Sequence, residues 1–179
     1  MKYILAPSIL AADFKNLGNE IKATEENGAK YLHFDVMDGL FVPSISFGMP
    51  VLKSLRKVTN MTFDVHMMVK DPERYVEEFQ SCGADMITVH AEACRDLAET
   101  VKKIHETGAD AGVAVNPDTP LSAVTDVMDQ VEMILIMSVY PGFGGQKYIP
   151  ESTERIRTLR RMLDEKGLEH VLSLIHISE

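Results

Sequence analysis

Residues 31–37 read Tyr-Leu-His-Phe-Asp-Val-Met, and residues 62–68 read Thr-Phe-Asp-Val-His-Met-Met. Each run is largely apolar but contains a histidine and an aspartate two positions apart. Side chains two positions apart lie on the same face of a β-strand. Short, nearly continuous apolar runs are typical of parallel strands that are covered on both faces. The two runs therefore predict neighbouring strands of a buried parallel sheet, with the histidines and aspartates together on one face.

Runs of this kind alternate with amphipathic segments along the chain. We predict strands at residues 4–8, 31–37, 62–68, 85–90, 111–116 and 133–139. We predict helices at residues 13–27, 49–58, 72–81, 94–107, 121–129 and 151–166. Successive strands begin about 20 to 30 residues apart, which leaves room for one helix after each strand. The chain is therefore interpreted as an α/β protein built from repeated strand–helix units.

Such units form either an open doubly wound sheet or a (β/α)8 barrel. No Gly-x-Gly-x-x-Gly follows the first predicted strand, which disfavours the dinucleotide-binding open sheet. Polar residues instead recur at the C-terminal ends of the predicted strands, where a barrel gathers its active site. These residues are Ser8, His33, Asp35, His66, His90, Asn116 and Ser138. The pattern favours a (β/α)8 barrel of which only about six units are present.

The composition is that of a soluble globular protein. The 179 residues are 45% hydrophobic and 25% charged, and the formal net charge is −9. An acidic chain without a basic cluster disfavours nucleic-acid binding, and no apolar run reaches the ~18 residues of a membrane span. Two cysteines, Cys82 and Cys94, are too few for a disulfide scaffold. We therefore expect reduced thiols and a cytoplasmic location.

The two polar strands bring possible metal ligands together. In adjacent barrel strands, His33, Asp35 and His66 would lie within reach of one ion. Two imidazoles and a carboxylate suit Zn²⁺, Fe²⁺, Mn²⁺ or Co²⁺. The alternative is a set of hydrogen-bonded polar groups in the core, but the repetition on two successive strands favours a metal site. His90 faces inward in the same register and is interpreted as a residue behind the ligands.

A glycine-rich segment follows the predicted strand at residues 133–139. Residues 140–146 read Tyr-Pro-Gly-Phe-Gly-Gly-Gln, and closely spaced glycines let backbone N–H groups approach a ligand. Its position after a strand end favours binding over the alternative, a flexible surface connection. Met37, Met68 and Met137 stand near predicted strand ends. They are either ordinary core residues or a dry floor beneath the metal.

Six motifs in order resemble the ribulose-phosphate 3-epimerase family, from residue 4 to about residue 168. The motifs are residues 6–14, 33–39, 64–68, 88–93, 112–117 and 137–146. The resemblance implies a (β/α)8 TIM barrel of the ribulose-phosphate-binding type. It also implies a metal-dependent isomerase of carbohydrate metabolism. Such an epimerase interconverts D-ribulose 5-phosphate and D-xylulose 5-phosphate, in the pentose phosphate pathway, by proton abstraction at C3 through an enediolate.

The resemblance also implies roles for individual residues. By position, His33, Asp35 and His66 match ligands of one divalent metal ion (Zn, Fe, Mn or Co), and Asp35 also matches the catalytic acid/base. The implied substrate contacts are Ser8, His66, Gly142, Phe143, Gly144 and Gly145. The implied partner is a phosphorylated ketopentose. A homo-oligomer of the family type is expected, and neither nucleic acid nor membrane is.

The sequence departs from the family pattern in two places. Leu40 and Ser44 stand where the family commonly has His and Asn, in the loop after the His-Phe-Asp strand. Toward its C-terminus the family carries a Val-Asp-Gly-Gly segment, whose Asp is a further metal ligand and the second acid/base. In this sequence no Asp follows Asp164. We therefore expect an incomplete barrel domain at 1–168, an aberrant tail at 169–179, and impaired epimerase activity.

Two alternative functions stay open on the sequence. One is a 3-epimerase of ketohexose 6-phosphates such as allulose 6-phosphate, because one barrel site can serve both substrates. The other is a catalytically silent barrel fragment that binds metal and acts as an interaction partner. Exchange of the C3 proton of ribulose 5-phosphate with solvent deuterium distinguishes a working site from a silent one.

Overall fold

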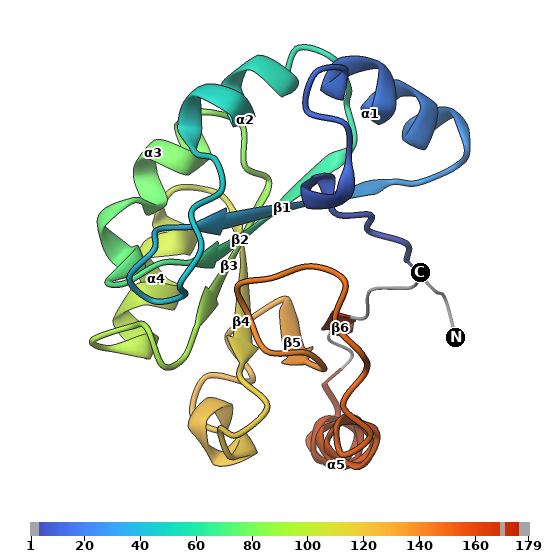
Figure 1. The fold of residues 1–179 in the computed structure, drawn as a ribbon. Coiled ribbons are helices and arrows are strands. Elements are labelled where there is room, and N and C mark those ends of the chain that lie inside the picture. Colours follow the sequence, from blue (N-terminus) through green and yellow to red (C-terminus); the bar gives the residue numbers. More distant parts are fainter. Residues whose placement is uncertain (1–3, 169–170, 176–179) are drawn as a thin grey trace.

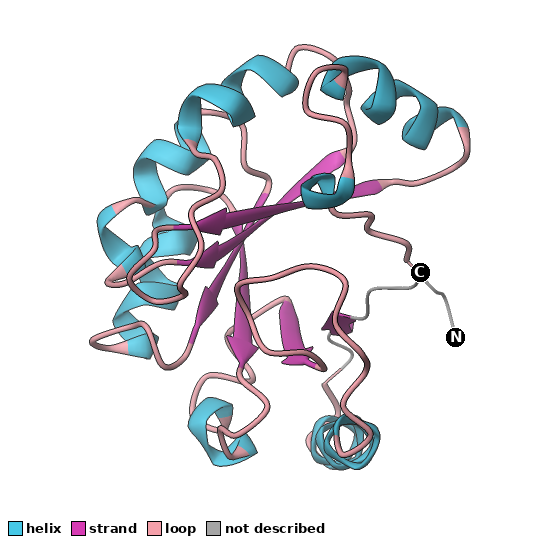
Figure 2. Ribbon diagram, viewed as in Figure 1, coloured by secondary structure: helices cyan, strands magenta, loops and turns pink. Residues whose placement is uncertain are grey.

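The computed structural model of the chain describes residues 4–168 and 171–175. In this part, six parallel strands form one sheet in the order β1-β2-β3-β4-β5-β6. Figure 1 shows that the sheet curls around a common interior and that the helices cover its outer side. Figure 2, coloured by secondary structure, separates the inner layer of strands from the outer layer of helices. The strand–helix alternation predicted from the sequence is thus the architecture of the molecule.

The strands follow the predicted pattern closely. They are β1 (Tyr31–Met37), β2 (Thr62–Met68), β3 (Met86–His90), β4 (Asp110–Val115), β5 (Met133–Met137) and β6 (Val171–Ile175). β1 and β2 have the predicted bounds, and β3, β4 and β5 lie within two residues of theirs. In the parallel register Asp35 is opposite His66, and His33 is opposite Asp64. The register therefore places the four polar residues of these strands side by side.

The helices connect the strands on the outside of the sheet. They are α1 (Leu17–Glu26), α2 (Met49–Leu55), α3 (Val76–Ser81), α4 (Leu97–Glu106) and α5 (Ser152–Glu165). The described residues also form the short 3-10 helices η1 (Ile9–Ala11), η2 (Pro72–Arg74) and η3 (Leu121–Val124). The start of α4 is fixed locally, because the Asp96 carboxylate accepts a hydrogen bond from the Glu99 N–H at 3.1 Å.

The first predicted strand, at residues 4–8, is wrong. This segment contributes a single parallel bridge, from Ser8 to His33, together with a hydrogen bond from the His33 N–H to the Pro7 carbonyl at 2.9 Å. Pro7 has no N–H with which to continue a ladder. The segment still matters for function, because the bridge brings Ser8 beside β1.

Two predicted helices depart most from their expected bounds. The helix predicted at 72–81 is split into η2 and α3, because its first turn closes with a tighter bond from the Tyr75 N–H to the Pro72 carbonyl at 2.9 Å. The segment 121–129 contains only the short η3. Its Ser, Thr, Asp and Val residues have low helix propensity, which explains why the longer helix does not form.

The alternation along each strand divides the core into an outer and an inner part. Phe34 on β1 and Phe63 on β2 pack in the large apolar cluster that also contains Leu52 of α2. The intervening residues face the interior of the curl, where His33 is 7% exposed and Asp35 is 6% exposed. The polar face of β1 and β2 is therefore the inner face, and the curl of the sheet buries it.

The sheet continues beyond the domain boundary predicted at residue 168, since β6 pairs in parallel with β5. Residues 169–170 and 176–179 of the predicted tail lie outside the described residues, so the division of the chain at this boundary stays a prediction. β1 and β6 are the two edges of the sheet. The fold is that of a partial (β/α) barrel, as predicted. None of the helices in the described part is long and apolar enough to cross a membrane.

Candidate metal centre

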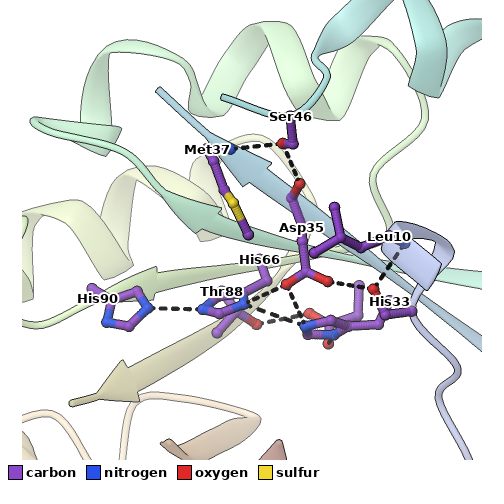
Figure 3. Close-up of polar contacts among 10 residues, drawn as sticks. Leu10, His33, Asp35, Met37, Ser46, His66, Thr88 and His90 are labelled. Carbon is purple, nitrogen blue, oxygen red and sulfur yellow. Dashed lines mark hydrogen bonds and ion pairs between the residues drawn. The ribbon is translucent and has the colours of Figure 1, made fainter. Parts of the chain in front are cut away.

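Three side chains from the inner face of β1 and β2 meet at one point, as Figure 3 shows. We call these residues, His33, Asp35 and His66, the triad. His33 Nε2 lies 3.3 Å from Asp35 Oδ1, and His66 Nδ1 lies 3.0 Å from the same oxygen. The two nitrogens are 3.3 Å apart. The β1–β2 register causes this convergence, because Asp35 is opposite His66 and His33 precedes Asp35 by two positions on the same face.

The triad has the dimensions of a metal site. Ligand atoms about 2.1 Å from one ion lie about 3.0 Å apart in an octahedron and about 3.4 Å apart in a tetrahedron. The three separations in the triad fall within this interval. Among the described residues, the triad is the group of His, Cys, Asp and Glu side chains whose ligand atoms converge in this way. Two imidazoles and a carboxylate suit divalent transition metals and zinc, so the residues fit a metal ion.

A second aspartate orients His33. Asp64 Oδ2 lies 2.8 Å from His33 Nδ1, and the other Asp64 oxygen accepts a hydrogen bond from Thr88 Oγ1 at 2.8 Å. A carboxylate only accepts hydrogen bonds, so His33 Nδ1 carries a proton and donates it toward Asp64. Gly112 on β4 leaves space for this contact, because a Cβ there would lie 2.3 Å from Thr88 Oγ1.

His66 is held through another histidine. The Nε2 atom of His66 lies 2.8 Å from the Nε2 atom of His90 on β3, as Figure 3 shows. At this distance one of the two nitrogens donates its N–H and the other accepts it. His90 Nδ1 lies 3.3 Å from Glu92 Oε2. His90 therefore lies behind His66, between the triad and Glu92.

Glu92 ends this series of contacts in the turn after β3. Its Oε1 accepts a hydrogen bond from the Asn116 N–H at 2.8 Å, and Thr119 also donates to the carboxylate. Burial alone would raise the pKa of Glu92, but the hydrogen bonds from His90, Thr119 and Asn116 outweigh burial and lower this pKa to about 2. Glu92 is therefore ionised at neutral pH and offers only acceptor oxygens.

The two oxygens of Asp35 have different partners. Oδ1 belongs to the triad, and Oδ2 accepts a hydrogen bond from Ser8 Oγ. Ser8 is itself fixed at the start of η1, where its Oγ accepts a hydrogen bond from the Leu10 N–H at 3.1 Å. The main chain of Asp35 is held as well, because its carbonyl accepts a hydrogen bond from Ser46 Oγ at 2.6 Å. The structure thus places Ser8 against the residue predicted as the acid/base.

Burial and neighbouring charges shift the pKa values of the triad in different directions. Burial alone would raise the pKa of Asp35, yet the charge and the hydrogen bond of His33 hold it well below its usual range. Burial alone would lower the pKa of His33, yet Asp35 and Asp64 raise it well above its usual value. Burial is the largest cause that lowers the pKa of His66, to about 4. In the metal-free protein a proton therefore resides on His33, and an entering cation must displace it.

The glycine-rich segment after β5 lies against the loop after β1. Gly142 has a φ of +115°, and a Cβ there would lie 3.2 Å from the Cβ of Val42. Gln146 shapes the turn, because its side-chain amide donates to the carbonyls of Tyr140 and Phe143 at 2.5 and 2.9 Å. Figure 1 shows this segment in orange, arching away from β5. The predicted substrate contacts of the segment share one turn, and their role stays a prediction.

The three methionines do not form one floor beneath the triad. Met37 and Met68 pack together with Val42, whereas Met137 packs in a separate cluster with Leu135. The hypothesis of a shared floor therefore fails for Met137.

Sequence reasoning assigned no role to Asp64, Thr88 or Glu92. A signal existed for Asp64, because the strand pattern already placed it on the face of the triad. Glu92 gave no such signal, since its partners come from other elements of the fold. Asp38 was also missed; its carboxylate accepts the Lys70 N–H at 2.8 Å and so ties the loop after β1 to the end of β2.

Comparison with known sequences identifies the family. The sequence model of the "Ribulose-phosphate 3 epimerase family" matches residues 4–175. The chain belongs to the ribulose-phosphate 3-epimerase family. It is 48% identical over 168 residues to the ribulose-phosphate 3-epimerase of Bacillus subtilis. The aligned region covers 94% of this chain and 77% of that enzyme. It is 51% identical over 168 residues to the Synechocystis enzyme of the same name, covering 93% and 73% of the two chains.

Solved structures support the fold. A mutant tryptophan synthase α-subunit from Pyrococcus furiosus superposes with a TM-score of 0.67 at 14% identity, over 98% of this chain and 78% of that one. The 3-keto-L-gulonate-6-phosphate decarboxylase of Vibrio cholerae gives a TM-score of 0.65 at 13% identity, over 97% and 79%. At such low identity the likeness concerns the fold alone. It agrees with a partial (β/α) barrel and says nothing about the substrate.

Proposed function

We propose that this epimerase-family chain interconverts D-ribulose 5-phosphate and D-xylulose 5-phosphate by proton transfer at C3. The observation that supports this most directly is the buried triad, in which Asp35 is both a potential ligand and a potential base. Family membership supports an isomerase that acts on a phosphorylated ketopentose. We place the reaction in the pentose phosphate pathway and in the cytoplasm, where the free thiols of Cys82 and Cys94 would stay reduced.

We assign the triad one divalent ion, Zn, Fe, Mn or Co. His33 Nε2, Asp35 Oδ1 and His66 Nδ1 would hold it. A bound cation supplies positive charge beside the substrate carbonyl, whose oxygen becomes negative when C3 loses its proton. The proposed ligands are buried, so bulk water is largely excluded and this charge acts in a low dielectric.

Asp35 is proposed as the base because its second oxygen is available. The lowered pKa keeps Asp35 ionised, and Oδ2 faces Ser8 rather than the triad. The Ser8 hydroxyl rotates freely and can turn from Asp35 to a substrate oxygen when the carboxylate takes up the proton. We propose that Ser8 and His66 contact the sugar, and that backbone N–H groups of residues 142–145 contact its phosphate.

Epimerisation also requires that a proton be returned to the opposite face of C3. Asp35 is the single carboxylate of the triad, and we propose that it serves one face of C3. Proton abstraction and epimerisation are therefore separate observations for this chain.

A homo-oligomer of the family type is part of the proposal, and light scattering on the purified chain measures it.

The test follows the C3 proton of ribulose 5-phosphate by NMR in D₂O, with protein loaded in turn with each of the four metals. We expect exchange of this proton, and Asp35→Asn slows it at least about 100-fold, because the amide keeps the shape but cannot take up the proton. Asp129→Asn, at an exposed surface position, is the matched control. Formation of xylulose 5-phosphate, measured in the same sample, reports proton return.

The same experiment decides between the alternatives. Absence of exchange with all four metals would refute the proposed reaction. Uptake of one metal ion per chain without exchange would identify a catalytically silent metal-binding barrel. Faster exchange with allulose 6-phosphate than with ribulose 5-phosphate would identify a ketohexose-6-phosphate epimerase.

A further inference from the structure

Glu92 touches neither the triad nor the proposed substrate contacts, but it contacts His90, which in turn contacts His66. The carboxylate is ionised and has two acceptor oxygens, each with its own donor. Oε1 receives the Asn116 N–H at 2.8 Å, and Oε2 faces His90 Nδ1 at 3.3 Å. A carboxylate cannot donate, so the proton in the second contact belongs to His90 Nδ1.

The proton on His90 Nδ1 determines where the next protons lie along this series of contacts. A neutral imidazole with its proton on Nδ1 has a lone pair on Nε2. The Nε2 atoms of His90 and His66 are 2.8 Å apart, so with a neutral His90 the proton of that bond comes from His66 Nε2. The lone pair of His66 then resides on Nδ1, where the protonated Nε2 of His33 lies 3.3 Å away and can donate to it and to Asp35 Oδ1.

We propose that Glu92 is a positioning residue, which fixes the tautomers of His90 and His66 so that the Nδ1 lone pair of His66 points into the triad. The proposal rests on the metal site proposed above, because an inward lone pair is what a cation requires of a histidine ligand. The opposite tautomers would place a proton on His66 Nδ1, between the ligand atoms, and would block the site.

A glutamine at position 92 cannot replace the carboxylate. Its amide has one acceptor oxygen and one donor nitrogen, whereas three donors, His90, Thr119 and the Asn116 N–H, converge on this side chain. If the amide oxygen keeps the Asn116 N–H, the amide nitrogen faces His90 Nδ1 and favours the reversed tautomers. Glu92→Gln therefore changes the direction of the hydrogen bonds with almost no change in size.

The chain offers a matched control elsewhere. Glu132 Oε2 also accepts from a histidine, His105 Nε2 at 3.0 Å, and from a main-chain donor, the Ala111 N–H at 2.7 Å. This pair is partly exposed, with 39% of the His105 side chain and 44% of the Glu132 side chain accessible. Glu132→Gln thus makes the same chemical change in a similar hydrogen-bonding arrangement that does not include the triad.

The experiment reads the tautomers and the metal affinity separately, on the full chain. Two-bond ¹H–¹⁵N correlations of histidine-labelled, metal-free protein show which ring nitrogen of His66 and His90 is protonated. We expect protonated Nε2 in His66 and protonated Nδ1 in His90 for the wild type and Glu132→Gln, and a loss of this pattern in Glu92→Gln. Competition with a chelator measures the zinc dissociation constant. We expect zinc binding about 10- to 100-fold weaker in Glu92→Gln and unchanged in Glu132→Gln.

Two results would overturn the proposal. The first is a wild-type spectrum with the proton of His66 on Nδ1, a result that needs no variant to fold. The second is an unaltered His66 tautomer and zinc affinity in a folded Glu92→Gln chain. Failure of the metal site itself gives a different signature: the wild type would show the expected tautomers but would bind none of the four metals.

Discussion

The two histidines of the triad are supported in different ways. His33 contacts Asp64 directly, and Asp64 is held by Thr88; we call Asp64 and Thr88 the inner support. His66 is held by His90 and Glu92, which we call the outer support. The inner support lies on strands and is buried, whereas the outer support ends in a turn, where the Glu92 side chain is 22% exposed.

The two supports differ in whether they only orient their histidine or also place a negative charge against it. Both supports contain a carboxylate that accepts a hydrogen bond from a ring nitrogen facing away from the triad. The Asp64 charge lies directly against His33 and helps to raise its pKa. The Glu92 charge is one ring farther away, and the pKa of His66 falls to about 4. The inner support therefore supplies orientation and a proton-holding charge, and the outer support supplies mainly orientation.

Breaking the inner support should have the largest effect. Asp64→Ala leaves the His33 N–H and the Thr88 hydroxyl without their buried partner and should cost about 3–5 kcal/mol of unfolding free energy. Zinc binding should weaken about 10- to 100-fold. Urea unfolding of the metal-free protein and chelator competition measure the two effects. Asp64→Asn keeps an acceptor oxygen for His33 and should lose much less stability; equal losses in both variants would contradict a hydrogen-bonding role.

Crowding the inner support from behind should have the next largest effect. A Cβ at position 112 would lie 2.3 Å from Thr88 Oγ1, so Gly112→Ala must displace Thr88 and should cost about 1–3 kcal/mol. Denaturant unfolding measures this cost. Gly18→Ala in α1 is the control, because its Cβ would meet only Val58 at 3.9 Å and alanine favours a helix. If Gly112→Ala proved as stable as the control, the packing of position 112 against Thr88 would be less tight than the structure indicates.

The two supports also differ in how well they could be predicted from the sequence. β1 and β2 could be predicted to the residue, because a period of two polar positions in a buried strand is visible in the letters. The triad follows from those two strands and one step of register. The inner support was within reach for the same reason, since Asp64 lies two positions before His66 on the same face.

Other parts of the molecule depend on contacts that the sequence does not display. The bond between His66 and His90 follows from the pairing of β2 with β3 in the curled sheet, and Glu92 acts from a turn. The segment at 121–129 has the apolar spacing of a helix but lacks the propensity for one. β6 at 171–175 was assigned to an aberrant tail, although the family sequence model extends to residue 175, because its long-range pairing with β5 cannot be read from the sequence.

The stabilisation that the ionised Glu92 of the outer support provides should be lost at low pH. The pKa of Glu92 is about 2 in the folded protein and 4.5 by reference, so the unfolded chain takes up more protons between these values. The stabilisation is complete above pH 4.5 and is lost as the pH falls toward 2. Glu92→Gln lacks it, so the wild type should be more stable by about 1.5 kcal/mol at pH 6. This gap should shrink as the pH falls through 4 and 3.

Urea unfolding at several pH values measures the gap. The charged or titratable groups near Glu92 are His90, Cys94 and Arg155. A gap that stays constant from pH 6 to pH 3 would show that the Glu92 charge contributes nothing to stability.

The smallest effect is expected where the outer support meets α5. Arg155 donates to the Asn116 carbonyl at 3.0 Å, and the Asn116 N–H holds Glu92. Arg155 Nε is buried without a hydrogen-bond partner in the described part of the chain, so Arg155→Met removes one bond and one unsatisfied donor. These changes oppose each other, and the unfolding free energy should change by less than about 1 kcal/mol. Zinc affinity should fall less than about threefold, which corresponds to about 0.7 kcal/mol. A tenfold loss of affinity would instead mean that the outer support extends through Asn116 to α5, and that orientation of His66 depends on a helix packed outside the sheet.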